Sequence, residues 1–447
     1  METEHEERAD AGRRPPVRAL VAGSVGNFIE WYEFGVYGYF ATVIAERFFT
    51  PAGGGTFEGL VKTYASFALA FFFRPVGAAL FGRLGDRIGR RPVLILVISL
   101  MTVTTALIGA LPAYATVGVL APWLLTLLRV LQGLSAGGEF GGAVAAMTEF
   151  APPDRRGLYG AWQSFTVALG LLGGAGVAAV LASLLSEAQL NAWGWRVPFL
   201  LALPMGLGAL WLRLRLDETP AFRDRQPTES LPARDVAWAV ALGAGRVMGW
   251  AAAGYAFLVV LPSYLQTALH ATFREALTAT VLANLGFAAT IIPAGLLSDR
   301  IGRRPVMLTG AGLVVVLAVP LLALLRGDGS TLLKGSAVLL AGAVVGLMAG
   351  PGPALLAEMF PTRVRCTGLG LAYALSNAVF SGCAGLIITE AVKRTGNVDV
   401  PAYYAAAACA VSMLALSRKT AFDGTAGKAG GTDAGDRPDV GNVVRRH

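Results

Sequence analysis

The sequence predicts an all-α, polytopic membrane protein with about twelve transmembrane helices. Hydrophobic residues make up 55% of the 447 residues, and the mean hydropathy is +0.58. Charged residues make up only 15%, whereas a soluble domain normally carries about 25%. Apolar runs recur at the length of about 20 residues that a helix needs to cross about 30 Å of hydrocarbon. A large soluble α/β enzyme would need these runs to be short strands, and they are too long for that.

Twelve apolar runs follow one another along the chain. We expect the first six spans at 18–45, 57–82, 92–112, 119–149, 157–183 and 195–216. We expect the second six at 236–268, 273–297, 304–325, 332–357, 366–389 and 402–417. Runs longer than about 25 residues are accommodated by helix tilt. The two weakest are 273–297, which Asn284 and Thr290 interrupt, and 402–417, which is short.

Polar stretches divide these runs into two bundles. The charged segment 1–17 lacks the apolar core of a secretory signal and is expected in the cytoplasm. The polar linker 217–235 separates a six-helix bundle at 18–216 from a second one at 236–417. The tail 418–447 is rich in glycine, alanine and aspartate, so we expect it to be cytoplasmic and disordered.

The distribution of basic residues predicts the topology. If both termini are cytoplasmic, the short loops on that side hold sixteen arginines, and the opposite loops hold eight lysines and arginines. This asymmetry fits the positive-inside rule. Topology therefore explains the formal charge of +8, and no nucleic-acid partner is needed. The three cysteines and three histidines lack metal-ligand spacing, so the sequence predicts neither a metal site nor a cofactor.

An internal repeat relates the two bundles. The octapeptide DRIGRRPV at 86–93 recurs without change at 299–306, nearly half the chain later. Each copy lies between the second and third runs of its half, and 149–156 and 358–365 are a weaker echo of each other. Two like-oriented halves follow, and such repeats place a substrate site between them near the bilayer midplane.

Several motifs carry a resemblance to a known family. Residues 82–91 (GRLGDRIGRR) resemble the signature between the second and third helices of the major facilitator superfamily. Residues 26–37 (GNFIEWYEFGVY) resemble the first helix of its metabolite:proton symporter branch, which includes carriers for proline/betaine, α-ketoglutarate, shikimate and citrate. Further matches are 74–77, 129–140 and 193–199, so the resemblance runs from about residue 20 to 416. Glu33 departs from the branch, which usually has aspartate there.

The resemblance implies twelve helices in two pseudo-symmetric bundles, a bacterial inner-membrane location and function as a monomer. It also implies a gate at the duplicated motif. Asp86 is expected to pair with arginine and with a helix N-terminus of the other half, closing the cytoplasmic side, and Asp299 is its weaker counterpart. The alternative is that these arginines only mark the cytoplasmic side of the membrane, but the exact duplication of the motif argues against it. The candidate gating residues are Gly82, Gly85, Asp86, Arg87, Gly89, Arg90 and Arg91, with Asp299, Arg300, Gly302 and Arg303 in the second copy.

Carboxylates inside the predicted spans are candidate proton carriers. Glu30 and Glu33 fall at mid-membrane depth and share an arc of about 120° with Asn27, Phe34 and Tyr37. Intramembrane acids are costly and usually face a cavity or a partner, and surroundings of low polarity favour their protonated form. The alternative for each acid is a structural ion pair with an arginine of a neighbouring helix.

The fourth run adds charged groups to this set. Arg129, Gln132 and Glu139 share one helical face. The resemblance links Arg129 to proton transfer, so charge relay with a glutamate and substrate binding remain equal alternatives for it. Gly133 and Gly137 form a smooth ridge that predicts close helix packing. The candidate proton-coupling residues are Glu30, Glu33, Arg129 and Glu139.

Candidate substrate contacts come from both halves. Arginine is suited to a fork-like grip on a carboxylate, which makes Arg74 a candidate, with a role as counter-ion to Glu30 or Glu139 as the alternative. The candidate polar side chains from the spans of the second half are uncharged. Taken singly, such a side chain more often forms a hydrogen bond between helices than a substrate contact. The candidate substrate-binding residues are Asn27, Tyr37, Arg74, Gln132, Gln163, Tyr255, Asn284 and Asn377.

We therefore expect a secondary transporter that imports a small organic metabolite by proton symport through alternating access. A carboxylate is favoured and a zwitterionic osmolyte stays open. The expected partners are this metabolite, protons and the lipid bilayer. A proton-coupled efflux antiporter is the first alternative, but the fifth run reads GLLGGAG at 170–176, without the proline usual in drug antiporters. A non-transporting sensor is the second. An enzyme is disfavoured because the chain has neither a phosphate-binding loop nor a catalytic constellation.

Overall fold

The computed structural model describes residues 17–50, 55–88, 90–137, 140–141, 144, 147–148, 151–152, 154–214, 232–361 and 364–419. Of residues 17–23, 56, 82–83, 85–88, 90–91, 94, 213 and 366 it describes the backbone alone. Several predictions therefore lie outside the described residues: Glu139, Gly89, most of the linker 217–235 and the tail beyond Lys419. The same holds for the side chains of Asp86, Arg87, Arg90 and Arg91 and for the surroundings of Gly82 and Gly85.

The first half folds into helices close to the predicted spans, except that the fourth, predicted at 119–149, is described as a continuous helix only to Ala136, and much of its remainder lies outside the described residues. The first span is α2 (Val17–Tyr39), α3 (Ala41–Ile44) and the π-helical η1 (Ala45–Phe49). The next are α4 (Thr56–Ile88), α5 (Arg90–Ala110), the short α6 (Tyr114–Val117), α7 (Leu120–Ala136) and α9 (Arg156–Leu184). The sixth is α11 (Arg196–Leu214), which follows the short α10 (Glu187–Gln189) and η2 (Leu190–Gly194).

The second half repeats this order, with π-helical segments inside two spans. The seventh span is α12 (Ala233–Gly254), η4 (Tyr255–Val259) and α13 (Leu261–Ala268). Next come α14 (Phe273–Ile301), α15 (Arg303–Arg326), and α16 (Thr331–Ala349) with α17 (Gly352–Glu358). The last two spans are α18 (Arg365–Ser376), η5 (Asn377–Gly382) and α19 (Ala384–Thr395), and then α20 (Val400–Ser417).

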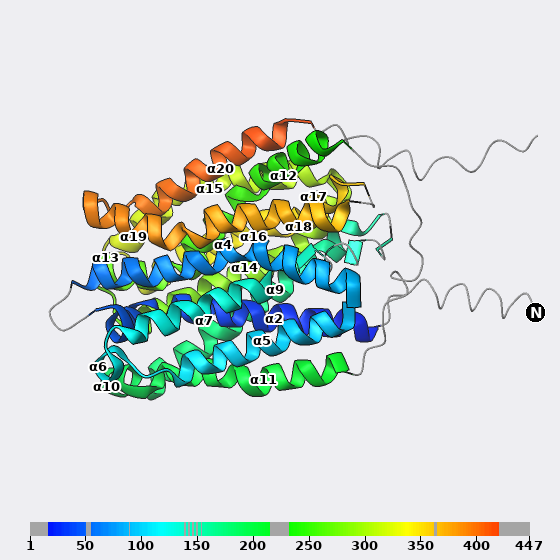
Figure 1. Cartoon of the computed structure of the whole chain (residues 1–447). Helices are drawn as coiled ribbons and strands as arrows, with labels where there is room; N and C mark the ends of the chain where they lie inside the picture. Colours follow the sequence, from blue (N-terminus) through cyan, green and yellow to red (C-terminus); the bar gives the residue numbers. More distant parts are fainter. Residues whose placement is uncertain are drawn as a thin grey trace, which may run out of the picture.

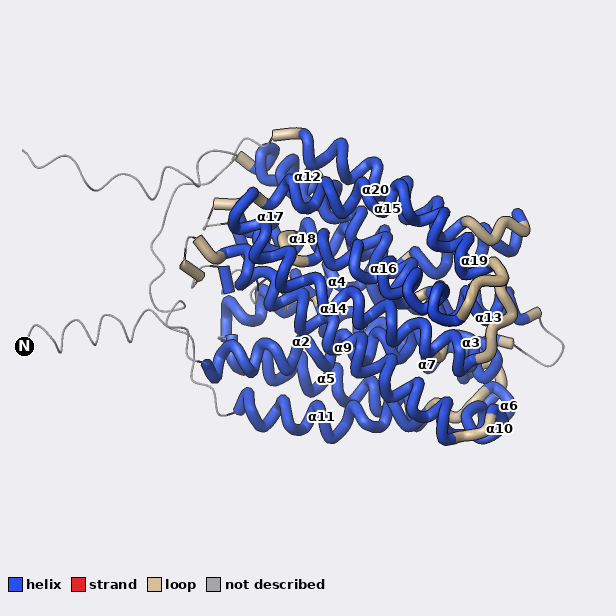
Figure 2. The backbone as a smooth tube through the Cα atoms, turned by 180° about the vertical axis from the view of Figure 1, so that it is seen from behind, coloured by secondary structure: helices blue, strands red, loops and turns tan. Residues whose placement is uncertain are grey.

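The helices lie side by side along one direction, with most loops at the two ends of the bundle (Figure 2). Among the described residues, eight helical segments are long and apolar enough to cross a membrane, and the bent pair Glu187–Gly194 and Arg196–Leu212 makes a ninth. The shorter apolar helices Ile95–Ala110 and Leu120–Ala136, together with α2, are compatible with twelve spans.

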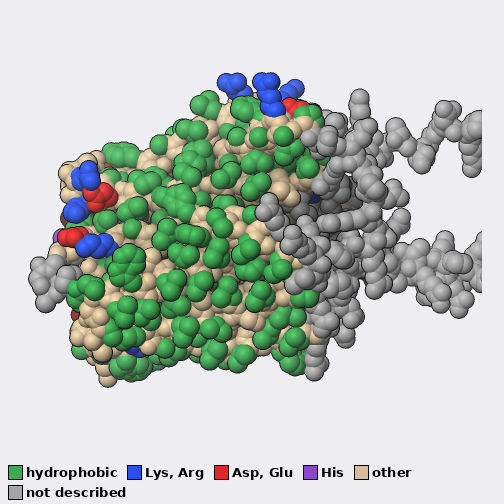
Figure 3. Space-filling model, in the orientation of Figure 1, with side chains coloured by type: hydrophobic (Ala, Val, Ile, Leu, Met, Phe, Trp, Pro, Cys, Tyr) green, Lys and Arg blue, Asp and Glu red, His purple; other side chains and the backbone are tan. Residues whose placement is uncertain are grey.

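The start of α2 and the end of α20 lie at the same end of the bundle (Figure 1), which we call the terminal end; the opposite end is the far end. On the face seen in Figure 3, apolar side chains cover the middle and charged ones gather near the two ends. Large apolar side chains such as Trp123 (73% exposed) and Leu414 (69% exposed) point outward. This is the surface that a protein surrounded by lipid needs.

Glycines bring neighbouring helices into backbone contact, as the ridge on the fourth run predicted. A Cβ on Gly133 would lie 1.9 Å from the carbonyl oxygen of Ala70 on α4, and one on Gly137 would lie 1.9 Å from that of Arg74. In the second half a Cβ on Gly342 of α16 would lie 1.8 Å from the carbonyl oxygen of Ala283 on α14. The close approach of α4 and α7 brings their arginines, Arg74 and Arg129, within electrostatic range of each other.

The duplicated motif is less of a loop than the sequence predicted. Helix α4 continues to Ile88 and α14 continues to Ile301, and the next helices begin at Arg90 and Arg303, so each copy is divided between the end of one helix and the start of the next. Gly302 has a φ of +95°, a backbone conformation that favours glycine, and it makes the turn into α15. In the second copy, Asp299 therefore lies on the end of a helix rather than on a free loop.

Candidate functional site

A small cavity lies between the two halves. Its volume is about 30 Å³, which holds one or two water molecules and no organic metabolite. The lining comes mostly from the second half, with contributions from α2 and α9 of the first. Among its residues are Trp31, Trp250, Tyr255, Tyr373, Asn377 and Ser381. Substrate binding therefore requires the helices around the cavity to move apart.

A buried ion pair lies close to this cavity. Arg74 Nη2 is 3.1 Å from Glu30 Oε1, and both side chains are less than 10% exposed. The guanidinium of Arg74 also lies over the rings of Phe71 and Phe34, at 4.2 and 4.5 Å from their centroids. Tyr255, a cavity residue, is within electrostatic range of both members of the pair. Of the two alternatives for Arg74, this state shows the counter-ion to Glu30.

Arg129 is the centre of a second polar cluster and is fully buried. Its guanidinium lies over the ring of Tyr37, 3.6 Å from the centroid. Its Nη1 donates to Gln132 Oε1 at 2.6 Å, and Gln132 Nε2 donates to Thr105 Oγ1 at 2.5 Å. The hydroxyl of Tyr37 bonds to Ser66 at 2.6 Å. Side chains of α2, α4, α5 and α7 thus meet at one arginine.

Glu33 lies beside this cluster and, among the described residues, has no ion pair. It is 1% exposed; Thr105 is its hydrogen-bonding neighbour, and Glu30 and Arg129 are the charged groups nearby. The two glutamates of α2 therefore differ within the described part of the chain: Glu30 is paired with Arg74, whereas Glu33 has only the neutral Thr105 as a partner. An unpaired buried carboxyl group is far less costly when it is neutral.

The remaining substrate candidates lie in different places. Tyr255 and Asn377 line the cavity. Asn27 donates to Thr166 Oγ1 at 2.6 Å and to the carbonyl oxygen of Gln163 at 3.2 Å, so it joins α2 to α9. Asn284 donates to the Thr280 carbonyl oxygen at 2.9 Å within α14. Asn27, Gln163 and Asn284, like Tyr37 and Gln132, serve helix packing in this state and do not line the cavity.

Sequence reasoning missed the aromatic character of the cavity. Trp31, Trp250, Tyr373 and Phe287 all line it. Trp31 and Tyr255 pack with ring centroids 6.2 Å apart, and Trp250 and Tyr373 with centroids 5.9 Å apart. The available signal was aromatic residues near the middle of predicted spans. That signal is weak, because an aromatic side chain in an apolar run can face lipid, core or cavity alike.

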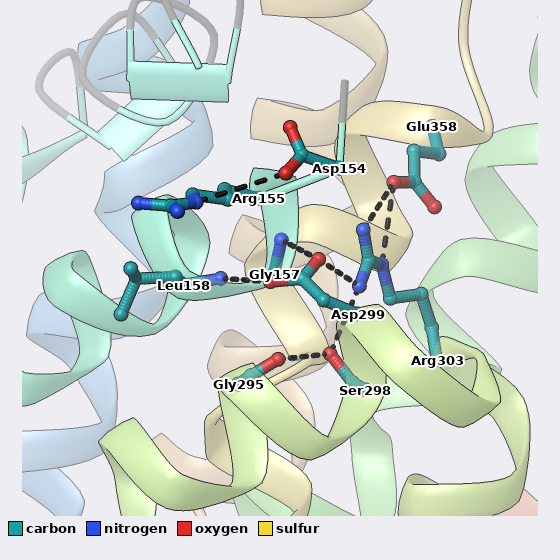
Figure 4. A network of polar contacts seen from close by, with 9 residues as sticks. All are labelled: Asp154, Arg155, Gly157, Leu158, Gly295, Ser298, Asp299, Arg303 and Glu358. Carbon is teal, nitrogen blue, oxygen red and sulfur yellow. Dashed lines mark hydrogen bonds and ion pairs between the residues drawn. The ribbon is translucent and has the colours of Figure 1, made fainter. Parts of the chain in front are cut away.

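A polar network joins the halves at the terminal end (Figure 4). Asp299 of α14 accepts hydrogen bonds from the backbone N–H groups of Gly157 (2.8 Å) and Leu158 (2.9 Å). These are first-turn donors of α9, which have no partner inside their own helix, and the positive end of the helix dipole favours the carboxylate. Arg303 Nη1 bonds to Asp299 Oδ1 at 2.5 Å, and its Nη2 lies 3.1 Å from Glu358 Oε1.

This network has the form that the sequence predicted for Asp86, with Asp299 as its weaker counterpart. In the described part of the chain it is Asp299 that contacts arginine and a helix N-terminus of the other half. The geometry connects the terminal ends of α9 and α14 directly. Separating the halves there must break both backbone hydrogen bonds.

The halves also meet at the far end. Tyr64 and Ser263 share a hydrogen bond of 2.7 Å, and Thr42 donates to Gln266 Oε1 at 3.2 Å. A Cβ on Gly385 of α19 would lie 2.2 Å from the ring of Tyr64, so α19 and α4 touch closely. Among the described residues, the halves are in contact on both sides of the cavity of about 30 Å³, an arrangement that we call the occluded state. A separate cavity of about 270 Å³ lies between the halves at the far end, with Thr42, Glu46 and Gln266 in its lining.

Comparisons with known proteins agree with this architecture. The family model "Sugar (and other) transporter" matches residues 19–236, and "Major Facilitator Superfamily" matches residues 247–435. A glycine betaine/proline/ectoine/pipecolic acid transporter of Dickeya dadantii is 35% identical over 89% of this chain and 82% of its own length. An α-ketoglutarate permease of Escherichia coli is 35% identical over 91% of this chain and 94% of its own length.

A further relative and a solved structure are also similar to this chain. A citrate-proton symporter of Klebsiella pneumoniae is 34% identical over 89% of this chain and 90% of its own length. The solved structure of a proton:xylose symporter superposes with a TM-score of 0.74 at 18% identity, covering 90% of this chain and 94% of that one. At this identity the structural likeness concerns the fold alone.

Proposed function

This chain belongs to the major facilitator superfamily and is a multi-pass membrane transporter, not an enzyme. On that premise we propose that it imports a small zwitterionic or anionic metabolite by proton symport, through alternating access around the cavity between its halves. The contrast between paired Glu30 and unpaired Glu33 carries this proposal. One carboxylate remains neutralised by a cation while the other is free to take up and release a proton.

Glu33 is placed for this role by its surroundings. Among the described residues its partner is the neutral Thr105 hydroxyl rather than a paired cation, and a buried carboxyl group without a paired cation is far less costly when it carries its proton. Arg129 is its cationic neighbour and offers a partner for the charged form after rearrangement. A proton taken up from one side can therefore be released on the other when the local contacts change. The relative named as a citrate-proton symporter supports the same coupling.

The cavity lining favours a zwitterionic osmolyte over the carboxylate that the sequence favoured. Faces of Trp and Tyr attract a quaternary or secondary ammonium through cation–π contact, and Trp31, Trp250, Tyr255 and Tyr373 supply such faces. The guanidinium of Arg74 has five N–H donors, so it can bind the carboxylate of the same molecule while it stays paired with Glu30. Proline and betaine relatives support this class, while α-ketoglutarate and citrate relatives keep a plain carboxylate as the second candidate.

The transport cycle follows from the occluded state. Opening the terminal end breaks the Asp299 network, and opening the far end breaks the contacts of Tyr64 and Thr42. We place the terminal end in the cytoplasm of a bacterial inner membrane, since the basic loops of the sequence gather on that side. The pseudo-symmetric halves enclose the cavity within one chain, which supports function as a monomer.

The proposal is tested with purified protein in liposomes carrying an imposed pH gradient. We expect accumulation of labelled glycine betaine or proline when the outside is acidic, and its collapse on adding a protonophore. Preference for citrate or α-ketoglutarate would move the substrate to the second candidate. Accumulation of substrate in everted vesicles with an acidic lumen would instead support the efflux antiporter.

A further inference from the structure

We propose that Gln132 is a positioning residue that holds the Arg129 guanidinium while Glu33 carries its proton, and releases it to Glu33 when that proton leaves. The inference rests on the proposed proton symport and deepens it. It gives Gln132 a role different from the substrate contact that the sequence suggested.

The Glu33 carboxyl group and the Arg129 guanidinium are both buried and could pair with each other, but they are not paired in the described structure. Among the described residues, Glu33 has only the neutral Thr105 hydroxyl as a hydrogen-bonding neighbour, and Nε and Nη2 of Arg129 have no hydrogen-bond partner. Glu33 and Arg129 are nonetheless electrostatic neighbours. Leaving such groups unpaired in a low-polarity interior is costly. A pair left open at this cost points to an arrangement that forms in another step of the cycle.

The contacts of Gln132 explain why the pair is open. Its Oε1 accepts from Arg129 at 2.6 Å, and its Nε2 donates to Thr105 at 2.5 Å, so both ends of the amide are engaged. Gln132 lies three residues after Arg129, on the same face of α7. The ring of Tyr37, 3.6 Å from the guanidinium carbon, supports the guanidinium in this position.

The relative strength of the two acceptors makes this arrangement a switch. An amide oxygen is a weaker partner for arginine than a carboxylate, because charge-assisted hydrogen bonds are about twice as strong as neutral ones. Protonated Glu33 therefore leaves Arg129 with Gln132, and ionised Glu33 draws it away. Thr105 links the two sites, since its hydroxyl accepts from Gln132 and its side chain neighbours Glu33.

The other charged groups near Glu33 are paired elsewhere or keep the same position relative to Glu33 whether or not Gln132 holds Arg129. Glu30 and Tyr32 face it from its own helix, α2, and Arg129 faces it from α7. On α4, Arg74 is paired with Glu30, and α5 contributes the neutral Thr105. From the second half, Tyr255 faces Arg74, Glu30 and Arg129. Arg129 is thus the cation whose position relative to Glu33 depends on Gln132.

The test compares two variants in which a buried glutamine is replaced by methionine, a side chain of similar length that cannot accept the same hydrogen bond. Gln132→Met removes the competing acceptor, and Gln163→Met alters an equally buried glutamine on α9 that bonds to Asn27. The readout is the infrared carboxyl band that Glu33→Gln removes, followed from about pH 4 to about pH 10 in detergent-purified protein.

We expect Gln132→Met to move the midpoint of this band toward acid by about one to two pH units, a 10- to 100-fold change, because Arg129 then pairs freely with Glu33. Gln163→Met should leave the midpoint unchanged. If the methionine variant does not fold, Gln132→Asn, which is too short to reach Arg129, should shift the midpoint in the same direction. An unchanged or alkaline-shifted midpoint, or a wild-type band that does not titrate, overturns the inference.

This readout separates the switch from the transport proposal, because the titration requires no substrate movement. An acid shift in protein that shows no pH-driven accumulation would support the switch and contradict proton symport. Normal pH-driven accumulation with no shift would leave symport standing and remove Gln132 from the mechanism.

Discussion

Asp299→Asn tests whether the network at the terminal end latches the two halves together. The wild-type carboxylate accepts from two first-turn N–H groups of α9 and pairs with Arg303. Asparagine has the same shape but offers one acceptor oxygen, and its NH2 group must face the other N–H. The substitution therefore removes one cross-half hydrogen bond and the charge at the helix N-terminus while it leaves packing intact.

The magnitude follows from these two losses. An N–H left without its acceptor costs about 1–3 kcal/mol, and the lost charge at a helix N-terminus costs about 0.3–1 kcal/mol. The sum is about 3 kcal/mol in favour of the state open at the terminal end. A coupling free energy of about 3 kcal/mol corresponds to about a 150-fold change in the ratio of states.

The assay is thiol accessibility at Ser164→Cys in a chain whose native cysteines are replaced. Ser164 is fully buried on α9 and donates to the Ala349 carbonyl oxygen of α16, so it lies at the junction of the halves. We expect Asp299→Asn to speed labelling by a water-soluble thiol reagent about 100-fold. Asp235→Asn, in the first turn of α12, makes the same chemical change and should alter the rate less than about fivefold.

Equal labelling rates in the two asparagine variants would refute the latch. So would faster labelling from the far end rather than the terminal end, because the network contacts only terminal-end groups of α9 and α14. A drop in the rate would mean that Asp299 holds the protein open.

Three further predictions concern the site and the scaffold. Glu33→Gln should abolish pH-driven accumulation in liposomes but retain part of substrate counterflow, since exchange needs no net proton movement; full accumulation would exclude Glu33 as the carrier. Trp250→Leu should weaken betaine binding about 5- to 30-fold through loss of cation–π contact, as measured by calorimetry, while Trp123→Leu on the exposed surface should not. Gly133→Ala should lower the melting temperature, because its Cβ would lie 1.9 Å from a carbonyl oxygen of α4, whereas Gly176→Ala meets nothing within 4 Å. Equal melting temperatures for the two alanine variants would contradict the packing argument.

The spans were predictable because each depends on its own residues. A run of about 20 apolar residues must become a helix in lipid, where every backbone group needs an internal partner. The repeat at 86–93 and 299–306 likewise identified two halves without any contact information. The glycine ridge at Gly133 and Gly137 was also correct, because a missing side chain permits close approach wherever the neighbouring helix lies.

Pairing between helices was harder to predict. The sequence named both Arg74 and Arg129 as partners for glutamate and left their roles open, and only the fold assigns Glu30 to Arg74 and Gln132 to Arg129. The aromatic lining of the cavity was missed for the same reason. Which way Trp250 or Tyr373 faces depends on helix rotation, which hydrophobicity alone does not specify.

By itself, then, the sequence determined a helical membrane protein of two like halves, with ionisable groups inside its spans. Those properties follow from local composition and from the cost of burying polar groups in lipid. The tertiary structure decided which charges meet, that Asp299 joins α14 to the start of α9, and that the cavity is closed to about 30 Å³. These depend on contacts between residues far apart in the chain, whose geometry is set by how whole helices pack.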